Sequence, residues 1–359
     1  MKVFITGGTG FIGKRVVAKL VERGDEVRVL ARSDRAAAIA ELLGARAVPG
    51  DLFDLPALRE GMQDCDLVFH IAAWYEFGTD NPEKMYRVNV EGTRNVMEAA
   101  LQASVPKIVH TSSTVVFGDT QGRVVDEGFF QGPPFLTEYE RTKWQAHYEV
   151  VLPLIEKGAP IIVVMPGGVY GPGDHSFIAE MMHQFCLGTM PVVPGHDTAL
   201  TFAHVDDVAQ GHILAADKGA LGESYILAGP NLTLGELFDL WALLLGRRRP
   251  WLYVPALFLR PLAPLVGLLN SWLPLPKLFS RETLALTGAT YMARSSKAQQ
   301  ELGWRPRPLR DGMLETLLTL SQEIPASKEA ACRRKKRALT ALFAASVLMI
   351  AWLLTRRRD

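Results

Sequence analysis

The chain has little cysteine and no excess of charge of either sign. Its 359 residues include three cysteines, Cys65, Cys186 and Cys332, which lie far apart and form no C-x-x-C pair. That spacing argues against a disulfide framework or a zinc site, and it suits a reducing compartment. Lys and Arg number 39 against 38 Asp and Glu, a net charge of +1. We therefore expect no metal site and no nucleic-acid partner.

Strand and helix patterns alternate over the first 165 residues, whereas glycine, proline and short apolar runs dominate after Pro166. Such alternation is typical of an α/β protein with a doubly wound parallel sheet, the Rossmann architecture. Buried strands are predicted at residues 3–5, 27–30, 45–48, 67–71, 107–111 and 161–164. We expect the Rossmann domain over residues 1–164 with 199–228, and a smaller C-terminal substrate lobe over 165–198 with 229–320.

Residues 251–279 are rich in Leu, Trp and Phe but are interrupted by prolines. One continuous transmembrane helix would leave backbone groups unpaired at each proline. We expect short helices that pack over a substrate pocket. An apolar portal or an interfacial surface is the alternative interpretation.

The last part of the chain has a different character, because residues 338–355 contain no charged side chain. They lie between the basic runs 333–337 and 356–358. This length is at the lower edge of what spans a hydrocarbon core of ~30 Å, and flanking basic residues anchor such a helix at the headgroups. We predict a transmembrane anchor at 338–355 after a basic linker at 321–337; a buried helix of a soluble domain is the alternative.

The orientation of this anchor follows from its flanks. The basic run before it holds five residues and the run after it three. The larger cluster favours a single-pass membrane protein whose catalytic domain lies in the cytoplasm. The N-terminus reaches glycines after a short strand, so no secretory signal is expected there.

A glycine-rich turn follows the first strand and precedes a helix. Gly7, Gly10 and Gly13 fit G-x-x-G-x-x-G, and Gly8 with the last two fits G-x-G-x-x-G. Glycines allow the backbone to approach a pyrophosphate, and the helix N-terminus supplies N–H donors to it. We predict a dinucleotide site here, with Phe11 and Ile12 as further contacts.

The end of the second strand bears on the cofactor. A ribose 2′-hydroxyl needs an acidic acceptor there, whereas a 2′-phosphate needs a cation. The sequence has Arg32 at this point, and the nearest acid, Asp34, lies beyond the strand. We therefore expect NADP(H) to be preferred, with NAD(H) as the alternative; Arg32 as a solvated loop residue is the other interpretation. Asp51 and Leu52, after the third strand, are the expected adenine contacts.

A phenol and an ammonium lie one helical turn apart at Tyr139 and Lys143, on one helix face. A phenol with a pKa of ~10 is a poor acid–base group at neutral pH. A nearby ammonium and an oxidised nicotinamide both favour the phenolate. The pair follows Thr111-Ser112-Ser113 at a strand end, which in turn follows the glycine-rich turn at the N-terminus. Motifs in this order along the chain indicate a functional site rather than a chance occurrence of Y-x-x-x-K.

With these motifs the chain resembles the extended short-chain dehydrogenase/reductase superfamily over roughly residues 1–320. The matching residues are Gly7, Gly10, Gly13, Asp51-Leu52, His70-Ile71-Ala72-Ala73, Asn89-Val90-Glu91-Gly92-Thr93, Thr111-Ser112-Ser113, Tyr139, Lys143, Val169-Tyr170-Gly171-Pro172-Gly173 and His204-Val205-Asp206-Asp207-Val208. Dimers are common in this superfamily, so a homodimer is one assembly that the resemblance implies.

The resemblance implies a catalytic role for three residues. Ser113 would hydrogen-bond the reacting oxygen, with Ser112 as the fallback. Tyr139 would exchange its proton with that oxygen. Lys143 would bind the nicotinamide ribose and lower the pKa of the tyrosine.

Other matching residues have supporting roles by the same resemblance. Ala72 and Ala73 would pass along the cofactor, and Asn89 would support the packing of strand and helix around it. His70 and His204 are interpreted as structural residues, because a lone histidine at a strand end is more often a satisfied buried side chain.

Departures from the family pattern narrow the range of substrates that the chain is expected to accept. Nucleotide-sugar epimerases usually carry an arginine and an asparagine around the proline after the sixth strand, but residues 165–169 of this chain contain neither. They also carry an Arg-Asp pair, which residues 200–203 of this chain lack. Sugar dehydratases have an Asp-Glu pair where Ser113 is followed by Thr114-Val115. The chain looks most like the dihydroflavonol-reductase and 3β-hydroxysteroid-dehydrogenase branches, which implies a small apolar alcohol or ketone. An epimerase or dehydratase of a sugar-like substrate, and a non-catalytic cofactor-binding scaffold or redox sensor, remain as alternatives.

Overall fold

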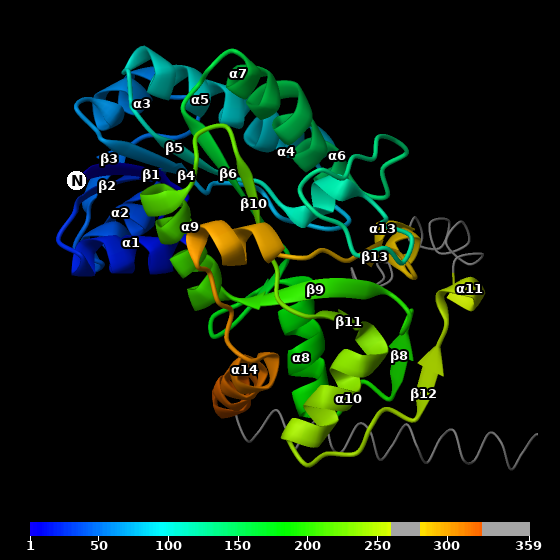
Figure 1. Cartoon of the computed structure of the whole chain (residues 1–359). Helices are drawn as coiled ribbons and strands as arrows, with labels where there is room; N and C mark the ends of the chain where they lie inside the picture. Colours follow the sequence, from blue (N-terminus) through cyan, green and yellow to red (C-terminus); the bar gives the residue numbers. More distant parts are fainter. Residues whose placement is uncertain (260–280, 325–359) are drawn as a thin grey trace, which may run out of the picture.

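The computed structural model describes residues 1–259 and 281–324 of the chain (Figure 1). Its main sheet has seven parallel strands in the order β10-β6-β5-β4-β1-β2-β3. Their bounds are β1 (Lys2–Thr6), β2 (Glu26–Ala31), β3 (Arg46–Pro49), β4 (Leu67–His70), β5 (Ile108–Thr111), β6 (Ile161–Pro166) and β10 (Ser224–Leu227). The order reverses direction at β1, so the predicted doubly wound sheet is confirmed.

Helices cover both faces of this sheet (Figure 1). On one face lie α1 (Gly13–Glu22), α2 (Asp34–Leu42) and α9 (Val205–Lys218); on the other lie α3 (Leu55–Met62), α5 (Gly92–Gln102) and α7 (Leu152–Glu156). Along β1, Val3 and Ile5 join one buried core and Phe4 joins the other. Such continuous burial is expected of a strand in a sheet covered on both faces.

The second helical layer continues toward the substrate lobe. Its further elements are α4 (Pro82–Tyr86), the π-helical turn η1 (Arg87–Glu91), the 3₁₀ turn η2 (Thr114–Phe117), α6 (Glu138–Gln145) and the π-helical turn η3 (Ala146–Val151). Thr137 begins α6 by accepting a hydrogen bond from the Glu140 amide at 3.0 Å. This cap places Tyr139 in the first turn of the helix.

The substrate lobe has its own core and sheets. One sheet contains β7 (Gly168–Tyr170), β9 (Ala199–His204), β11 (Asn231–Thr233) and β13 (Thr290–Tyr291), and a second pairs β8 (Val192–Pro194) with β12 (Leu252–Val254). Its helices are α8 (Phe177–Leu187), α10 (Leu234–Leu244), α11 (Ala256–Leu259), α13 (Arg281–Leu286) and α14 (Leu309–Glu323). Phe238 and Trp241 lie in its buried core.

The chain crosses between the two parts more than once. Of residues 199–228, β10 pairs in the main sheet and α9 packs on it, whereas β9 pairs in the sheet of the lobe. Late in the chain, the π-helical turn η6 (Ala298–Leu302) and Trp304 return to the main core.

Residues 251–259 form the strand β12 and the short helix α11, so only α11 has the form of the expected short helices; 260–279 lie outside the described residues. No helix within the described part of the chain is long and apolar enough to cross a membrane. The predicted anchor at 338–355 falls outside that part, as does the linker beyond residue 324.

Candidate active site

The glycine turn between β1 and α1 leaves no room for side chains. A Cβ at Gly13 would lie 2.1 Å from the carbonyl oxygen of Gly7. Gly7 has a φ of +73°, and a Cβ on it would lie 2.6 Å from the backbone nitrogen of Ala72. The turn thus packs on the segment after β4, which brings the predicted residues Gly7, Gly13 and Ala72 together. Such a bare backbone at a helix N-terminus fits a dinucleotide pyrophosphate.

The two residues between the last glycines differ in their surroundings. Ile12 packs against the main core, whereas the ring of Phe11 lies 5.2 Å from the guanidinium carbon of Arg15. Arg15 in turn pairs with Asp206 at 3.1 Å, which links the start of α1 to the start of α9. The glycine turn is therefore fixed by the core through Ile12 and by the start of α9 through Arg15.

A surface pocket of about 480 Å³ lies at the ends of β2 and β3. Arg32 and Asp51 both line it, together with Ser33 and Phe53. Ser33 also begins α2 by accepting a hydrogen bond from the Ala36 amide. The pocket brings Arg32, the predicted partner of a 2′-phosphate, and Asp51, the predicted adenine contact, into one cavity that Asp34 also lines.

Leu52 is placed differently from Asp51. Its side chain is buried in the core beneath this edge, and its carbonyl oxygen accepts a hydrogen bond from Asn95 at 3.0 Å. The neighbouring Phe53, rather than Leu52, lines the pocket. Leu52 therefore packs in the core next to the pocket and does not line it.

The end of β5 brings the predicted serine to the predicted tyrosine. Ser113 is extended and accepts a hydrogen bond from the Val115 amide at 3.3 Å, so it begins η2. Its hydroxyl donates to the Pro166 carbonyl oxygen at 3.4 Å and lies near enough to the phenol of Tyr139 to lower the pKa of that group slightly. The Ser112 hydroxyl is buried and has no hydrogen-bond partner among the described residues. The geometry therefore favours Ser113 over Ser112 for the catalytic role.

Lys143 lies one turn after Tyr139 on α6, as the spacing predicts. Its side chain is buried, and Nζ donates to the Thr111 carbonyl oxygen at 2.9 Å. Burial lowers the pKa of Lys143 to about 8. Burial also raises the pKa of Tyr139 above its usual value, against the smaller opposing effect of the Ser113 hydroxyl.

The expectation that Lys143 and an oxidised nicotinamide together lower the pKa of the tyrosine stays a prediction for the cofactor-bound enzyme. In the protein alone, desolvation dominates, because the ammonium faces the Thr111 carbonyl and the phenol is enclosed. Tyr139 is thus a protonated phenol at neutral pH. That state suits a proton donor rather than a standing base.

Asn89, on η1, connects this pair to the segment after β4. Its Oδ1 accepts from the Trp74 amide at 2.7 Å, and its Nδ2 donates to the Trp74 carbonyl oxygen at 3.0 Å. Nδ2 also donates to Thr142, the neighbour of Lys143, at 3.0 Å. Asn89 therefore sets the path of residues 74–77 across the catalytic helix.

Aromatic rings on that path surround the catalytic phenol. The ring of Tyr75 meets the ring of Tyr139 edge-on at 4.9 Å, and Phe77 does so at 6.1 Å. Phe177, at the start of α8, lies 6.4 Å from Phe77 and extends the group into the substrate lobe. We call Tyr75, Phe77 and Phe177 the aromatic wall. Sequence reasoning missed it, although Trp74-Tyr75-Glu76-Phe77 directly follows the matched Ala72-Ala73.

Glu140, next to the catalytic tyrosine, is a second residue that sequence reasoning missed. Its carboxylate is buried and accepts from Tyr291 Oη at 3.0 Å and from the Leu136 amide at 3.2 Å. Burial raises its pKa to about 7, against these hydrogen bonds. Because Tyr291 belongs to β13, Glu140 ties the catalytic helix to the substrate lobe.

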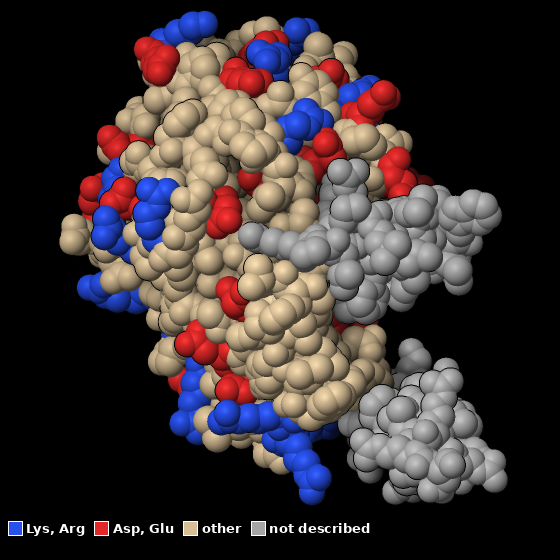
Figure 2. Space-filling view, turned by 90° about the vertical axis from the view of Figure 1, so that its right-hand side faces the viewer, with Lys and Arg blue, Asp and Glu red and all other residues tan. Residues whose placement is uncertain are grey.

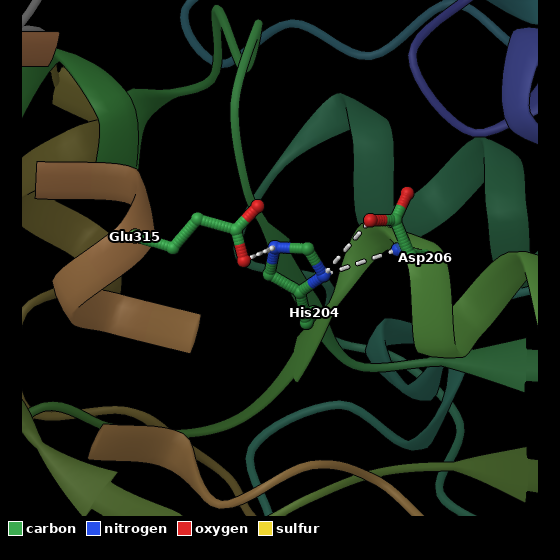
Figure 3. Close-up of side chains that lie close together, drawn as sticks. All are labelled: His204, Asp206 and Glu315. Atoms are coloured by element: carbon green, nitrogen blue, oxygen red, sulfur yellow. Dashed lines mark hydrogen bonds and ion pairs between the residues drawn. The ribbon is translucent and has the colours of Figure 1, made fainter. Parts of the chain in front are cut away.

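The two histidines interpreted as structural are both buried. His70 bonds to Thr6 at 2.7 Å and Thr93 at 3.0 Å, and burial lowers its pKa to about 3. His204 lies between Asp206 and Glu315, which approach opposite ring nitrogens at 3.7 and 3.8 Å (Figure 3).

An arginine forms ion pairs with both carboxylates near His204. Arg307 lies 3.0 Å from Glu315 and 3.8 Å from Asp206, so one guanidinium pairs with both carboxylates. One ligand atom from each of His204, Asp206 and Glu315 lies within 4.8 Å of the other two, a spacing that could hold a cation, and Arg307 already pairs with both carboxylates (Figure 3). The network joins α14 to the start of α9.

Proteins already known resemble this chain over most of its length. Residues 3–228 match the model of the NAD dependent epimerase/dehydratase family. Sterol demethylase protein B of Methylococcus capsulatus is 31% identical over 317 residues, which cover 86% of this chain and 95% of that protein. A 4-hydroxy-2-methyl-3-oxo-4-farnesyl-3,4-dihydroquinoline-1-oxide ketoreductase of Stigmatella aurantiaca is 35% identical over 228 residues, 63% of this chain and 68% of that protein. The crystal structure of gox2253 has a TM-score of 0.77 and 36% identity, covering 89% of this chain and 98% of that one.

Proposed function

The chain belongs to the NAD dependent epimerase/dehydratase family of enzymes, and on that premise we propose that it transfers a hydride between NADP(H) and an apolar molecule. The reacting group is a secondary alcohol or ketone on a lipid-like, steroid-like or polycyclic skeleton. The observation that carries this proposal is the aromatic wall around Tyr139. The motif-based resemblance to extended short-chain dehydrogenases is confirmed by the family match.

The aromatic wall favours an apolar substrate because its rings offer mainly apolar contact area, with the Tyr75 hydroxyl as its one hydrogen-bonding group. The segment after β6 supports the same choice. A side chain at Gly167 would lie 2.4 Å from Thr201 Cγ2, so this position cannot carry a long polar side chain. The nearby Met165 is fully buried. These two positions therefore offer no polar side chain to a sugar diphosphate.

The catalytic groups can serve the reductive direction without rearrangement. Ser113 would donate a hydrogen bond to the substrate oxygen, and Tyr139 would give its proton to that oxygen as the carbonyl carbon accepts the hydride. NADPH, when bound, would supply that hydride. Lys143 would hold the nicotinamide ribose and bring a positive charge near the phenol. The raised pKa of Tyr139 supports the proton-donating role, because the group enters the step protonated.

NADP(H) is the proposed cofactor because of the pocket at the ends of β2 and β3. Arg32 lines that pocket, and a guanidinium can meet a phosphate through paired donors. Use of NAD(H) remains compatible with the glycine turn, which contacts only the pyrophosphate that both cofactors share.

The test is turnover of apolar ketones, followed by NADPH absorbance. Replacing Tyr139 with Phe keeps the ring and removes the proton, so turnover should fall ~10²-fold or more while NADPH binding persists. The matched control is Tyr148→Phe, since that hydroxyl bonds only weakly to the Phe129 carbonyl at 3.4 Å. Near-normal turnover in Tyr139→Phe would overturn the mechanism. Conversion of nucleotide sugars without net NADPH consumption would favour the epimerase or dehydratase alternative.

We propose as well that residues 338–355 hold the enzyme on a membrane with its catalytic domain on the cytoplasmic side. The uncharged run and its basic flanks support this assignment. An apolar substrate supports it too, because such a molecule partitions into the bilayer that the anchor spans.

A further inference from the structure

We propose that the substrate lobe carries a second membrane contact, a surface that docks on an anionic bilayer. It consists of Trp251, Leu252, Leu257 and Phe258 on β12 and α11 with the adjoining arginines 247–249, and we call it the docking face. The proposal goes beyond the hydride-transfer function and does not require it. It concerns side chains of the folded lobe, separate from the proposed anchor at 338–355.

The docking face begins with large apolar side chains that point away from the core. Trp251 is 71% exposed, Leu257 75% and Phe258 66%, and Leu252 is exposed as well. Isolated exposed hydrophobic residues are ordinary, but four within eight positions on one strand and the helix that follows it are a concentration that favours an interaction site. Tryptophan and leucine beside a basic cluster are the composition of a surface that lies at the level of lipid headgroups.

The backbone beneath these side chains is tied to the lobe. β12 pairs with β8 over three residues. Tyr253, between the exposed positions, turns inward and donates to Asp239 at 2.6 Å. The Ala256 amide, at the start of α11, donates to Asp197 at 2.9 Å. The backbone that carries the apolar side chains is therefore held in place by strand pairing and hydrogen bonds to the rest of the lobe.

Positive charge borders the apolar residues. Arg247, Arg248 and Arg249 are exposed in the turn between α10 and β12. Arg247 donates to the Cys186 carbonyl oxygen, and Arg249 pairs with Asp239 at 3.0 Å. Figure 2 shows a broad uncharged area on the lower half of this side of the molecule, with Lys and Arg gathered below it. Near an anionic leaflet a cation that is not already paired with a carboxylate raises partitioning by a factor of about five, so the effect is smaller for Arg249 than for Arg248.

The course of the chain brings the same end of the lobe toward the proposed anchor. Ser321, in the last turn of α14, lies 3.6 Å from Cys186 Sγ, and Arg247 binds the backbone of that same cysteine. The chain thus leaves the described structure next to the arginines. Residues 325–337 can span at most ~45 Å when fully extended. An anchor in the bilayer would keep the docking face within reach of its surface.

The charge pattern also distinguishes a membrane from a second copy of the chain. A symmetric dimer across this face would bring two sets of arginines 247–249 together, and like charges at an interface are unfavourable. Anionic headgroups complement the arginines, and the acyl boundary accommodates Leu257 and Phe258.

The test places an environment-sensitive fluorophore on the full chain at Leu257→Cys, in a Cys332→Ser background. Cys65 and Cys186 are buried and escape labelling. The matched control is Leu42→Cys on α2, where the native leucine is 87% exposed on the other domain. Vesicles of phosphatidylcholine are compared with vesicles that also contain phosphatidylglycerol, each with and without a lipid-borne nitroxide quencher.

We expect the emission at position 257 to shift to shorter wavelength with the anionic vesicles and to be quenched by the nitroxide, while position 42 stays water-like. Arg248→Glu should reverse the shift, because it replaces a cation by an anion. Equal, unshifted emission at both positions would overturn the docking face. A shift that follows protein concentration without lipid quenching would also overturn it, in favour of self-association.

The anchor and the docking face can fail separately. Vesicle-bound protein that resists alkaline carbonate but shows no shift at position 257 retains the anchor and refutes the docking face. Protein that shifts at position 257 yet is released by carbonate retains the docking face and refutes the anchor.

Discussion

Replacing Glu140 with Gln should stabilise the protein at neutral and alkaline pH and leave it nearly unchanged in mild acid. The carboxyl group is buried beside the catalytic helix, and burial raises its pKa from 4.5 to about 7. The unfolded chain therefore releases this proton at a lower pH than the folded chain does. Between these two pKa values the folded state binds more protons, so its stability falls as the pH rises.

The size of the effect follows from the two pKa values. One pKa unit corresponds to 1.36 kcal/mol, so a rise of this size removes about 3 kcal/mol of folding free energy between pH ~4.5 and ~7. Above pH ~7 the loss levels off. Gln stays neutral, and its amide oxygen can still accept from the Leu136 amide and Tyr291 Oη. The variant should therefore lack this part of the pH dependence.

The assay is urea unfolding of wild type and Glu140→Gln at several pH values from 5 to 8, with Glu156→Gln, an exposed position on α7, as the control. The difference between wild type and Glu140→Gln should grow toward about 3 kcal/mol at pH 8 and stay small at pH 5. The control should follow the wild type throughout. Parallel profiles for Glu140→Gln and wild type would refute the buried, raised-pKa interpretation of this carboxyl group.

Three further predictions concern the cofactor site and the anchor. Arg32→Asp removes the proposed partner of the 2′-phosphate, so the ratio of NADPH to NADH dissociation constants should move toward NADH; an unchanged ratio would mean that Arg32 is only a solvated loop residue. Gly13→Ala places a Cβ 2.1 Å from the Gly7 carbonyl oxygen, so it should cost ~1–3 kcal/mol in unfolding experiments and weaken binding of both cofactors; unaltered binding would show that the turn can relax. Full-length protein should stay with membranes through alkaline carbonate, whereas a chain ending at Gln322 should be soluble and bind NADPH; full-length protein that is soluble without detergent would rule out the anchor at 338–355.

Local patterns predicted the parallel sheet and indicated which residues would lie together at the candidate site, because short-range geometry produces both. The sheet follows from alternating strands and helices, and the glycine turn follows from backbone positions that leave no space for a Cβ, as at Gly13. The spacing of Tyr139 and Lys143 places both on one helical turn whatever the rest of the chain does. Ser113 could be named as well, because it follows closely on β5, a strand whose carboxyl end parallel pairing brings to the same edge of the sheet.

Tertiary structure decided what surrounds those residues. Tyr75, Phe77 and Phe177 come from two separate segments, and no periodicity relates them to Tyr139. The choice of Ser113 over Ser112 depends on which hydroxyl meets the phenol. Neither the aromatic wall nor the choice between the two serines can be derived from residue spacing along the chain.

The pKa values show this division most directly. The sequence places an ammonium one turn from the phenol of Tyr139 and so suggests a lowered pKa. Folding encloses that phenol, directs the ammonium of Lys143 to the Thr111 carbonyl, and raises the pKa of Tyr139 in the protein alone. Glu140 changes from an ordinary helix carboxylate into a buried link to Tyr291 in the same way. The order of residues determines which groups can meet, but desolvation depends on the whole set of neighbours that folding assembles, and only the three-dimensional structure contains that set.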